Sequence, residues 1–341
     1  MSIKLERAVE ASAPTRIDLA GGTVDLWPLY LFHPEAVTVN AAIDLRVRVR
    51  VVPAKKSVIR LTDQNADRTV EWKTPGKISG HSGYELFAQA LRHFSVKQGL
   101  RIEFASDVPR GAGLAGSSAL LVAFCGALMR SGKQGIRRDR FLALVRDLET
   151  RLIKVPAGMQ DYYPALWGGV QALWWRPGEV LRESLPVLPS ELEKRLLLVY
   201  TGTSRHSGTN NWEVFKRHLD GDRKVHRLFG KIVEAGQEMV TALRRGDFRG
   251  VGKAMAAEAE ARKRLFPGIM TREIRSLESA VRRLGAIGTK VCGAGGGGCV
   301  VVYVDPEDKA RSREKIREMG FQDLPFKIVK KGLSFRRVEY P

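Results

Sequence analysis

The stretch that decides the fold lies at residues 107–121 and reads DVPRGAGLAGSSALL. An alternating apolar and charged segment precedes it at 100–105, LRIEFA, which is typical of a half-buried strand. A nearly continuous apolar run follows at 117–129 and is typical of a helix buried on most of its faces. The stretch therefore predicts a strand that turns through a glycine-rich loop into a buried helix.

The composition of this loop indicates phosphate binding. Its glycines and serines are Gly111, Gly113, Gly116, Ser117 and Ser118. Glycines let the backbone pass close to a ligand, and the free N–H groups and dipole at a helix start favour a phosphate there. No lysine follows the glycines, so this is not the GxxxxGK[ST] loop. A tight turn with a serine N-cap is the alternative, but three glycines and two serines exceed what a turn requires.

Two acidic residues downstream can complete such a site. Glu149 lies on a predicted helix that ends before Pro156, and Asp161 follows in a glycine-containing loop. Phosphoryl transfer needs one carboxylate to help hold Mg²⁺ and another to orient or deprotonate the attacking hydroxyl. Taken alone, the local sequence slightly favours a solvated helix glutamate and a helix-capping aspartate over functional roles for the two residues.

Two further glycine turns follow strand-like segments. Residues 16–25 read RIDLAGGTVD, and residues 293–298 carry five glycines in six positions. The first could be a surface arginine beside a Gly-Gly hairpin. The second is hard to explain by packing alone, because every glycine costs chain entropy on folding.

These segments together resemble the three motifs of the GHMP kinases, the family of galactokinase and of homoserine, mevalonate and phosphomevalonate kinases. Residues 109–119 resemble the second motif, P-x-x-x-G-L-G-S-S-A, with Ala115 as a one-residue insertion. Residues 16–25 resemble the first motif and residues 293–298 the third. The acidic stretch 149–161 is similar to the one that holds the family's Mg²⁺-binding glutamate and catalytic aspartate.

The resemblance implies roles for named residues. The implied ATP site is Pro109, Gly111, Ala112, Gly113, Leu114, Ala115, Gly116, Ser117 and Ser118. Ser118 and Glu149 would hold Mg²⁺. Asp161 would act as base or hydroxyl orienter, and Arg16 would offset developing charge. Candidate substrate contacts are Gly22, Asp25, Asn40, Gln160, Tyr163, Arg205, Gly295 and Gly296.

The implied fold class is α+β, with two domains. Residues 1–187 would form a domain resembling domain 2 of ribosomal protein S5, and residues 188–341 a ferredoxin-like domain. The proline-containing stretch at 185–189 separates the two halves. Helices are predicted at 224–243, 247–264, 271–284 and 308–319, and a terminal strand near 326–331.

Composition sets outer bounds on function. The chain has 341 residues, three cysteines without metal-type pairing and no long uncharged apolar run. We expect a cytoplasmic protein without a membrane span or signal peptide. The net charge of +20 is spread over the whole chain without a basic tail, so nucleic acid is not the expected partner. No zinc site is expected, because histidines such as His81 and His206 lack metal-ligand spacing. The sequence does not fix the oligomeric state, and a homodimer is one option.

The predicted function is ATP-dependent phosphorylation of a hydroxyl, the anomeric one, on a sugar or sugar phosphate. The form G-x-Q-D-x-Y at 158–163 looks most like the heptose 7-phosphate kinase branch. Galactose, fucose and mevalonate kinases of the same family stay open as alternatives. A non-catalytic protein of this fold that binds a ligand or nucleic acid as a regulator is a rival, although it would be expected to lose Glu149 and Asp161. A decarboxylase acting on mevalonate diphosphate is disfavoured by the sugar-type Gly-Gly-x-x-Asp turn.

Overall fold

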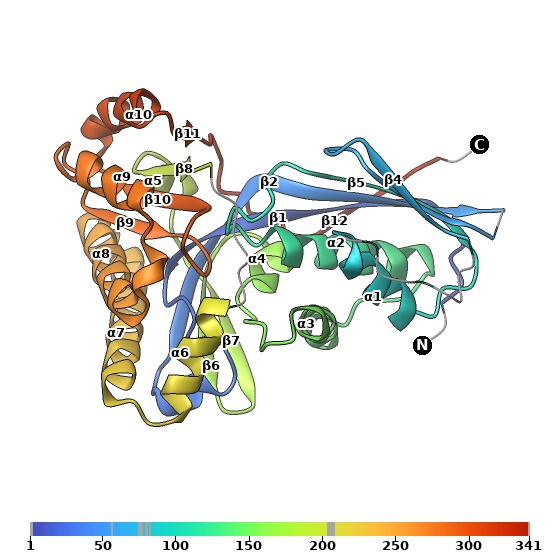
Figure 1. Cartoon of the computed structure of the whole chain (residues 1–341), viewed down its shortest axis with the longest axis horizontal. Helices are drawn as coiled ribbons and strands as arrows, with labels where there is room; N and C mark the ends of the chain where they lie inside the picture. The colour runs from blue at the N-terminus through green and yellow to red at the C-terminus, as the bar shows by residue number, and fades with distance from the viewer. Residues whose placement is uncertain are drawn as a thin grey trace.

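Two β-sheets with helices packed on them make up the structure (Figure 1). The computed structural model describes residues 3–55, 57–73, 78, 81, 83–202 and 209–339. Helices and strands are mixed along the whole chain, which confirms the α+β class expected from the sequence. Among the described residues, none of the helices combines the length and the apolar character that crossing a membrane requires.

The first sheet is built around two long antiparallel strands. Its strands are β1 (Val9–Ala20), β2 (Val37–Ala54), β3 (Ile59–Asp63), β4 (Arg68–Trp72), β5 (Gly99–Ser106), β6 (Val170–Arg176), β7 (Glu179–Ser184) and β12 (Ser334–Arg337). The described strands run in the order β12–β1–β2–β5–β3–β4, and β6 and β7 extend the sheet from β2. The predicted strand at 100–105 lies within β5. Strand β1 pairs with β2 along nearly its whole length and ends at the Gly-Gly turn.

Four helices cover one face of this sheet (Figure 1). They are α1 (Glu85–His93), α2 (Gly116–Ser131), α3 (Arg138–Ile153) and α4 (Tyr162–Trp167). Helix α2 is buried on most sides, as its apolar composition predicts, and Leu121, Phe124 and Leu128 belong to the core beneath β1 and β2. Burying these side chains is the main favourable contribution to holding α2 on the sheet. The start of α2 is thereby fixed at the end of β5.

The second sheet lies between two layers of helices. Its strands are β8 (Leu196–Tyr200), β9 (Gly288–Val291), β10 (Cys299–Tyr303) and β11 (Gln322–Asp323). The helices are α5 (Pro189–Glu193), α6 (Thr209–Leu219), α7 (Arg223–Arg245), α8 (Phe248–Leu265), α9 (Arg272–Arg282) and α10 (Lys309–Glu318). Alternate residues of β10 face opposite sides. Val301 packs with α7 and α8, whereas Val300 and Val302 pack with α9 and α10.

The end of the chain returns to the first sheet. The last described strand, β12, pairs antiparallel with β1, and it begins at Ser334 rather than near residue 326 as predicted. At the predicted position, Ile328 makes only a single bridge to Ile43. The predicted strand was therefore placed too early, because the Lys330–Gly332 segment first bends around Gly168, where it leaves no room for a side chain. The division at residue 187 stays a prediction.

A buried cluster of charges joins β1 to α8 and β9. Lys290 donates from Nζ to Asp18 Oδ2 at 2.8 Å and to Glu258 Oε1 at 3.0 Å. All three side chains are at most 1% exposed. Burial alone would raise the pKa of Asp18, but Lys290, Arg16 and Arg262 outweigh it and hold that pKa below its usual value. The sequence pattern gave no sign of this cluster, because its members are far apart in the chain.

Replacing Lys290 tests how strongly the two sheets depend on this cluster. In Lys290→Met a side chain of similar size removes the charge and leaves two carboxylates buried without it. We expect the free energy of unfolding to fall by about 3–5 kcal/mol in chemical denaturation. The matched control is Lys315→Met, since Lys315 makes a 2.9 Å ion pair with Glu318 at the surface. There the expected loss is below about 1 kcal/mol. Equal small losses in both variants would contradict the proposed contribution.

Candidate active site

The predicted motifs meet around one cavity of about 700 Å³. The glycine loop, the start of α2, the end of β1 and the loop before α4 all line it. The glycine run after β9 closes it from the side of the second sheet. Segments separated by up to about 280 residues of sequence are thus brought to one place, as the three-motif pattern predicts.

Backbone contacts hold the second and third motifs together. A Cβ on Gly113 would lie 2.6 Å from the carbonyl oxygen of Cys292, and one on Gly298 would lie 2.8 Å from that of Ala112. The N–H of Cys299 donates to the carbonyl of Ala112 at 2.8 Å. Both glycines also have positive φ, so two independent constraints exclude a side chain. The third motif is therefore packed against the second motif.

The inserted residue of the second motif has a defined place. Ala115 adopts the left-handed conformation with φ 62° and immediately precedes α2. Its carbonyl accepts the N–H of Ala119 at 3.0 Å and so begins the helix. The insertion is taken up by this one left-handed residue, and Ser117 and Ser118 stay in the first turn of α2. Their positions relative to the helix start are those the motif predicts.

Glu149 gathers hydroxyl groups at that helix start. Its carboxylate accepts from Ser117 Oγ at 2.6 Å and from Ser118 Oγ at 2.9 Å. Tyr162 donates its hydroxyl at 2.5 Å. Burial raises the pKa of Glu149 although the three hydroxyls act in the opposite direction. A buried carboxylate beside serine oxygens is the all-oxygen donor set that Mg²⁺ prefers, so the residues fit the predicted metal.

Arg16 and Asp161 form an ion pair within the cavity. Arg16 donates from Nη2 and Nε to Asp161 Oδ1 at 2.6 and 2.9 Å, and from Nη1 to the carbonyl of Gly113 at 2.7 Å. The arginine is thus locked between the catalytic candidate and the glycine loop. Burial raises the pKa of Asp161, and Arg16 opposes that rise. Asp161 is the more exposed partner, with 26% of its side chain accessible.

Asp25 lies beside this pair and is held by Gln160. Its Oδ2 accepts from the Gln160 N–H at 3.0 Å and its Oδ1 from Gln160 Nε2 at 3.4 Å. Burial raises the pKa of Asp25 to about 6 in spite of the backbone hydrogen bond. A Cβ on Gly158 would lie 2.2 Å from Asp25 Oδ2, which explains the glycine in the G-x-Q-D sequence.

Three predicted substrate contacts lie away from the cavity lining. Asn40 is fully buried in β2 and donates to the carbonyl of Gln160 at 3.2 Å, so it supports the loop from behind. Tyr163 faces the core and stacks on Trp167 with ring centroids 5.1 Å apart. Gly296 donates its N–H to Ile269 at 2.8 Å. Tyr163 and Gly296 directly adjoin lining residues in the sequence, whereas Asn40 lies in a strand whose neighbouring residues do not line the cavity.

The other predicted residues are at the cavity, with one exception. Pro109, Gly111, Ala112, Gly113, Leu114, Ala115, Gly116, Gly22 and Gly295 all line it. Arg205 lies outside the described residues. Several lining residues were not predicted, and the polar side chains of Tyr162 and Arg262 are among them. Tyr162 could have been predicted as a site residue, because it directly follows Asp161. Arg262 lies at a basic helix end that resembles a solvated surface, but it donates to the carbonyl of Gly293 at 2.6 Å.

Comparison with known families identifies relatives of this chain. The model of the GHMP kinases N-terminal domain matches residues 83–169, and that of the C-terminal domain matches residues 239–321. A D-glycero-alpha-D-manno-heptose 7-phosphate kinase of Campylobacter jejuni is 25% identical, covering 97% of this chain and 100% of that protein. A mevalonate kinase of Thermococcus sibiricus is 26% identical over 97% of this chain and 99% of its own length.

A solved structure agrees over the whole length. The crystal structure of a D-glycero-D-manno-heptose 1-phosphate kinase from Bacteroides thetaiotaomicron superposes with a TM-score of 0.79 at 19% identity. The match covers 97% of this chain and 100% of that one. Both family models and the full-length relatives confirm the resemblance read from the motifs. The chain belongs to the GHMP kinases, phosphotransferases that act on hydroxyl groups.

Proposed function

We propose that this chain transfers the terminal phosphate of ATP to the anomeric hydroxyl of a sugar that already carries a phosphate. The observation that carries the proposal is the Arg16–Asp161 ion pair. It lines the same cavity as Asp25, which Gln160 holds, and as Glu149, whose carboxylate accepts hydrogen bonds from hydroxyl groups. The G-x-Q-D-x-Y sequence and the Campylobacter jejuni relative, a heptose 7-phosphate kinase, favour a heptose phosphate as substrate.

The residues divide the chemistry between them. Asp161 accepts a hydrogen bond from the acceptor hydroxyl and takes its proton as the oxygen attacks phosphorus. Arg16, fixed by Gly113 and Asp161, offsets the negative charge of the transferring phosphate. The N–H groups at the start of α2 bind phosphate oxygens. Mg²⁺, for which Ser118 and Glu149 are the proposed ligands, would neutralise phosphate charge when bound. Asp25 binds sugar hydroxyls by charge-assisted hydrogen bonds.

An ADP-release screen tests the substrate class. The panel contains free sugars, sugar phosphates with a free anomeric hydroxyl, sugar 1-phosphates and mevalonate, each with Mg-ATP. We expect the highest kcat/KM for a sugar phosphate with a free anomeric hydroxyl and little release with its 1-phosphate counterpart. Mevalonate is included because mevalonate kinases are equally similar in sequence. A preference for mevalonate, or no release above the substrate-free rate, would refute the proposal.

Asp161→Asn tests the base. The amide keeps an oxygen for Arg16 but cannot take a proton, so we expect kcat to fall by about 10²–10⁴. Binding of a non-hydrolysable ATP analogue, measured by calorimetry, should be retained. The matched control is Asp67→Asn, an exposed aspartate with positive φ in the turn between β3 and β4, where asparagine is equally acceptable. Turnover of Asp161→Asn equal to that of the control would exclude this role.

Asp25→Asn tests whether the aspartate that is proposed to bind the sugar lowers the stability of the folded protein. The folded pKa of about 6 lies above the ordinary 3.8, so the folded state binds more protons between these values and loses stability as pH rises through them. An asparagine avoids this cost, and its amide can donate to Gln160 Oε1, which lacks a partner among the described residues. We expect the variant to gain stability relative to the wild type from pH 4 to pH 8, by up to about 3 kcal/mol.

The same variant should bind sugar poorly. KM for the substrate found in the screen should rise while the KM for ATP stays near the wild-type value. Unfolding curves at pH 4, 6 and 8 measure the first effect, and initial rates measure the second. A stability difference that does not change with pH would show that Asp25 titrates normally. An unchanged sugar KM would remove Asp25 from the substrate site.

A further inference from the structure

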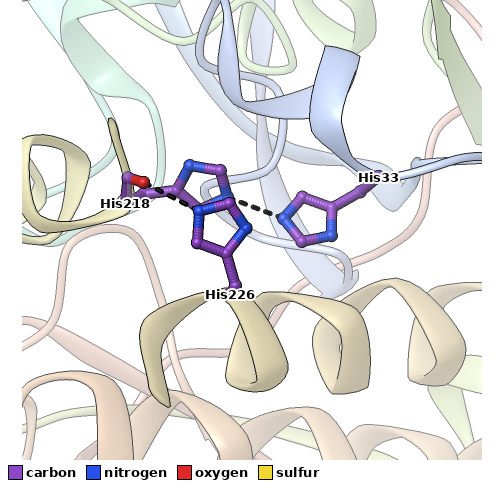
Figure 2. A group of neighbouring side chains, drawn as sticks. All are labelled: His33, His218 and His226. Atoms are coloured by element: carbon purple, nitrogen blue, oxygen red, sulfur yellow. Dashed lines mark hydrogen bonds between the residues drawn. The ribbon is translucent and has the colours of Figure 1, made fainter. Parts of the chain in front are cut away.

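Three histidines converge outside the active site (Figure 2). His33 directly follows the short helix η1 (Leu29–Phe32), His218 lies in α6 and His226 in α7. One ring nitrogen of each lies within 4.8 Å of the others. They are three of the six histidines in the chain, and none of them lines the cavity described above. The expectation that no histidines have metal-ligand spacing considered only neighbours in sequence, and these three come from distant segments.

The hydrogen bond of His226 fixes which of its nitrogens is free. Its Nε2 lies 2.8 Å from the carbonyl oxygen of His218. A carbonyl can only accept, so Nε2 carries the hydrogen and Nδ1 of the neutral ring keeps its lone pair. A ring N–H bound to a backbone carbonyl is the arrangement by which metal-binding histidines are usually oriented. His226 is therefore prepared to act as a ligand through Nδ1.

The other two rings meet nitrogen to nitrogen. His33 Nε2 and His218 Nε2 are 2.8 Å apart, so one proton or one cation must lie between them. Nitrogens bound to a tetrahedral metal at about 2.0–2.1 Å are separated by about 3.4 Å, so the two nitrogens would move apart by about 0.6 Å to admit an ion. The buried Nδ1 of His218 has no hydrogen-bond partner among the described residues. The hydrogen bond to His33 therefore satisfies only one of the two nitrogens of this buried ring.

The surroundings disfavour protonation of His33 and His218. Burial lowers the pKa of His33, and burial together with His226 and His33 lowers that of His218 to about 4. Aromatic rings enclose the group, with the Phe229 centroid 5.7 Å from His33 and the Phe32 centroid 5.4 Å from His218. Both shifts favour the uncharged imidazole of His33 and His218, which is the form that binds metals.

We propose that His33, His218 and His226 bind one divalent transition-metal ion, of which Zn²⁺ is the best match, with water as the fourth ligand. Imidazole ligands without a carboxylate select zinc and its neighbours over Mg²⁺, which prefers oxygen. The ion would tie the segment that leads from Asp25 to His33 to both α6 and α7. It acts on stability, and the proposal does not depend on the identity of the kinase substrate.

Metal content and thermal unfolding test the site in the full-length protein. The chain is stripped with a chelator, then dialysed against Zn²⁺ or Mg²⁺, and bound metal is measured by mass spectrometry. We expect one zinc per chain, and a Tm raised by Zn²⁺ but not by Mg²⁺. Co²⁺ should give the visible absorption bands of a four-coordinate ion. Zinc content no higher than background, or a Tm that Zn²⁺ leaves unchanged, would overturn the proposal.

Two variants locate the ion. His226→Gln, at a half-buried position, removes the Nδ1 ligand and should abolish zinc retention, the Tm shift and the cobalt bands, with the metal-free Tm near that of the wild type. His81→Gln is the control, because His81 is half-buried but distant from the group. Equal zinc retention in both variants would place the metal elsewhere and exclude this site. Should His226→Gln fail to fold, His33→Gln supplies the same comparison from the other side of the group.

Discussion

The close approach of two backbone segments is the constraint on which the active site depends. Gly113 and Cys292 come so near that a single Cβ could not be placed between them, and the hydrogen bond from Cys299 to Ala112 holds the segments together. This contact joins the first sheet to the second through main-chain atoms alone. Because Arg16 also binds the carbonyl of Gly113, the same glycine loop fixes the arginine that faces Asp161. A side chain at position 113 would displace the loop and the ion pair together.

Buried charge reinforces this contact from behind. Lys290 pairs with Asp18 on β1 and with Glu258 on α8, and Glu258 also accepts the N–H of Gly22. The turn that carries Asp25 is thus anchored to the second sheet by an ion cluster that solvent does not reach. Such pairs add little net stability compared with apolar contacts, but they are costly to break singly. They therefore specify one relative position of the two sheets more than they raise the total stability.

The sequence predicts the local parts of this structure well and the long-range pairings poorly. The glycine loop, the buried helix after it and the pairing of Glu149 with Ser118 follow from motif order, because each motif has one local conformation. The Lys290 cluster and the three histidines could not be read in the same way. Their members are brought together by tertiary packing, with His33 and His218 separated by 185 positions. Asn40 and Tyr163 were misplaced for a related reason, since strand and helix direction decide which face a side chain takes.

Three carboxylates of the cavity are buried in the free protein at an electrostatic cost. Burial raises the pKa of Asp25, Glu149 and Asp161 alike, because the ionised form of each carboxylate is less stable here than in water. Of these three, and within the part of the chain that the structure describes, Asp161 alone forms an ion pair, whereas Asp25 and Glu149 depend on amide and hydroxyl donors. Ligands that supply hydroxyl hydrogens at Asp25 and positive charge at Glu149 would relieve that cost on binding. Ligands of this kind would therefore bind more tightly, because their binding removes an electrostatic cost that the free protein carries.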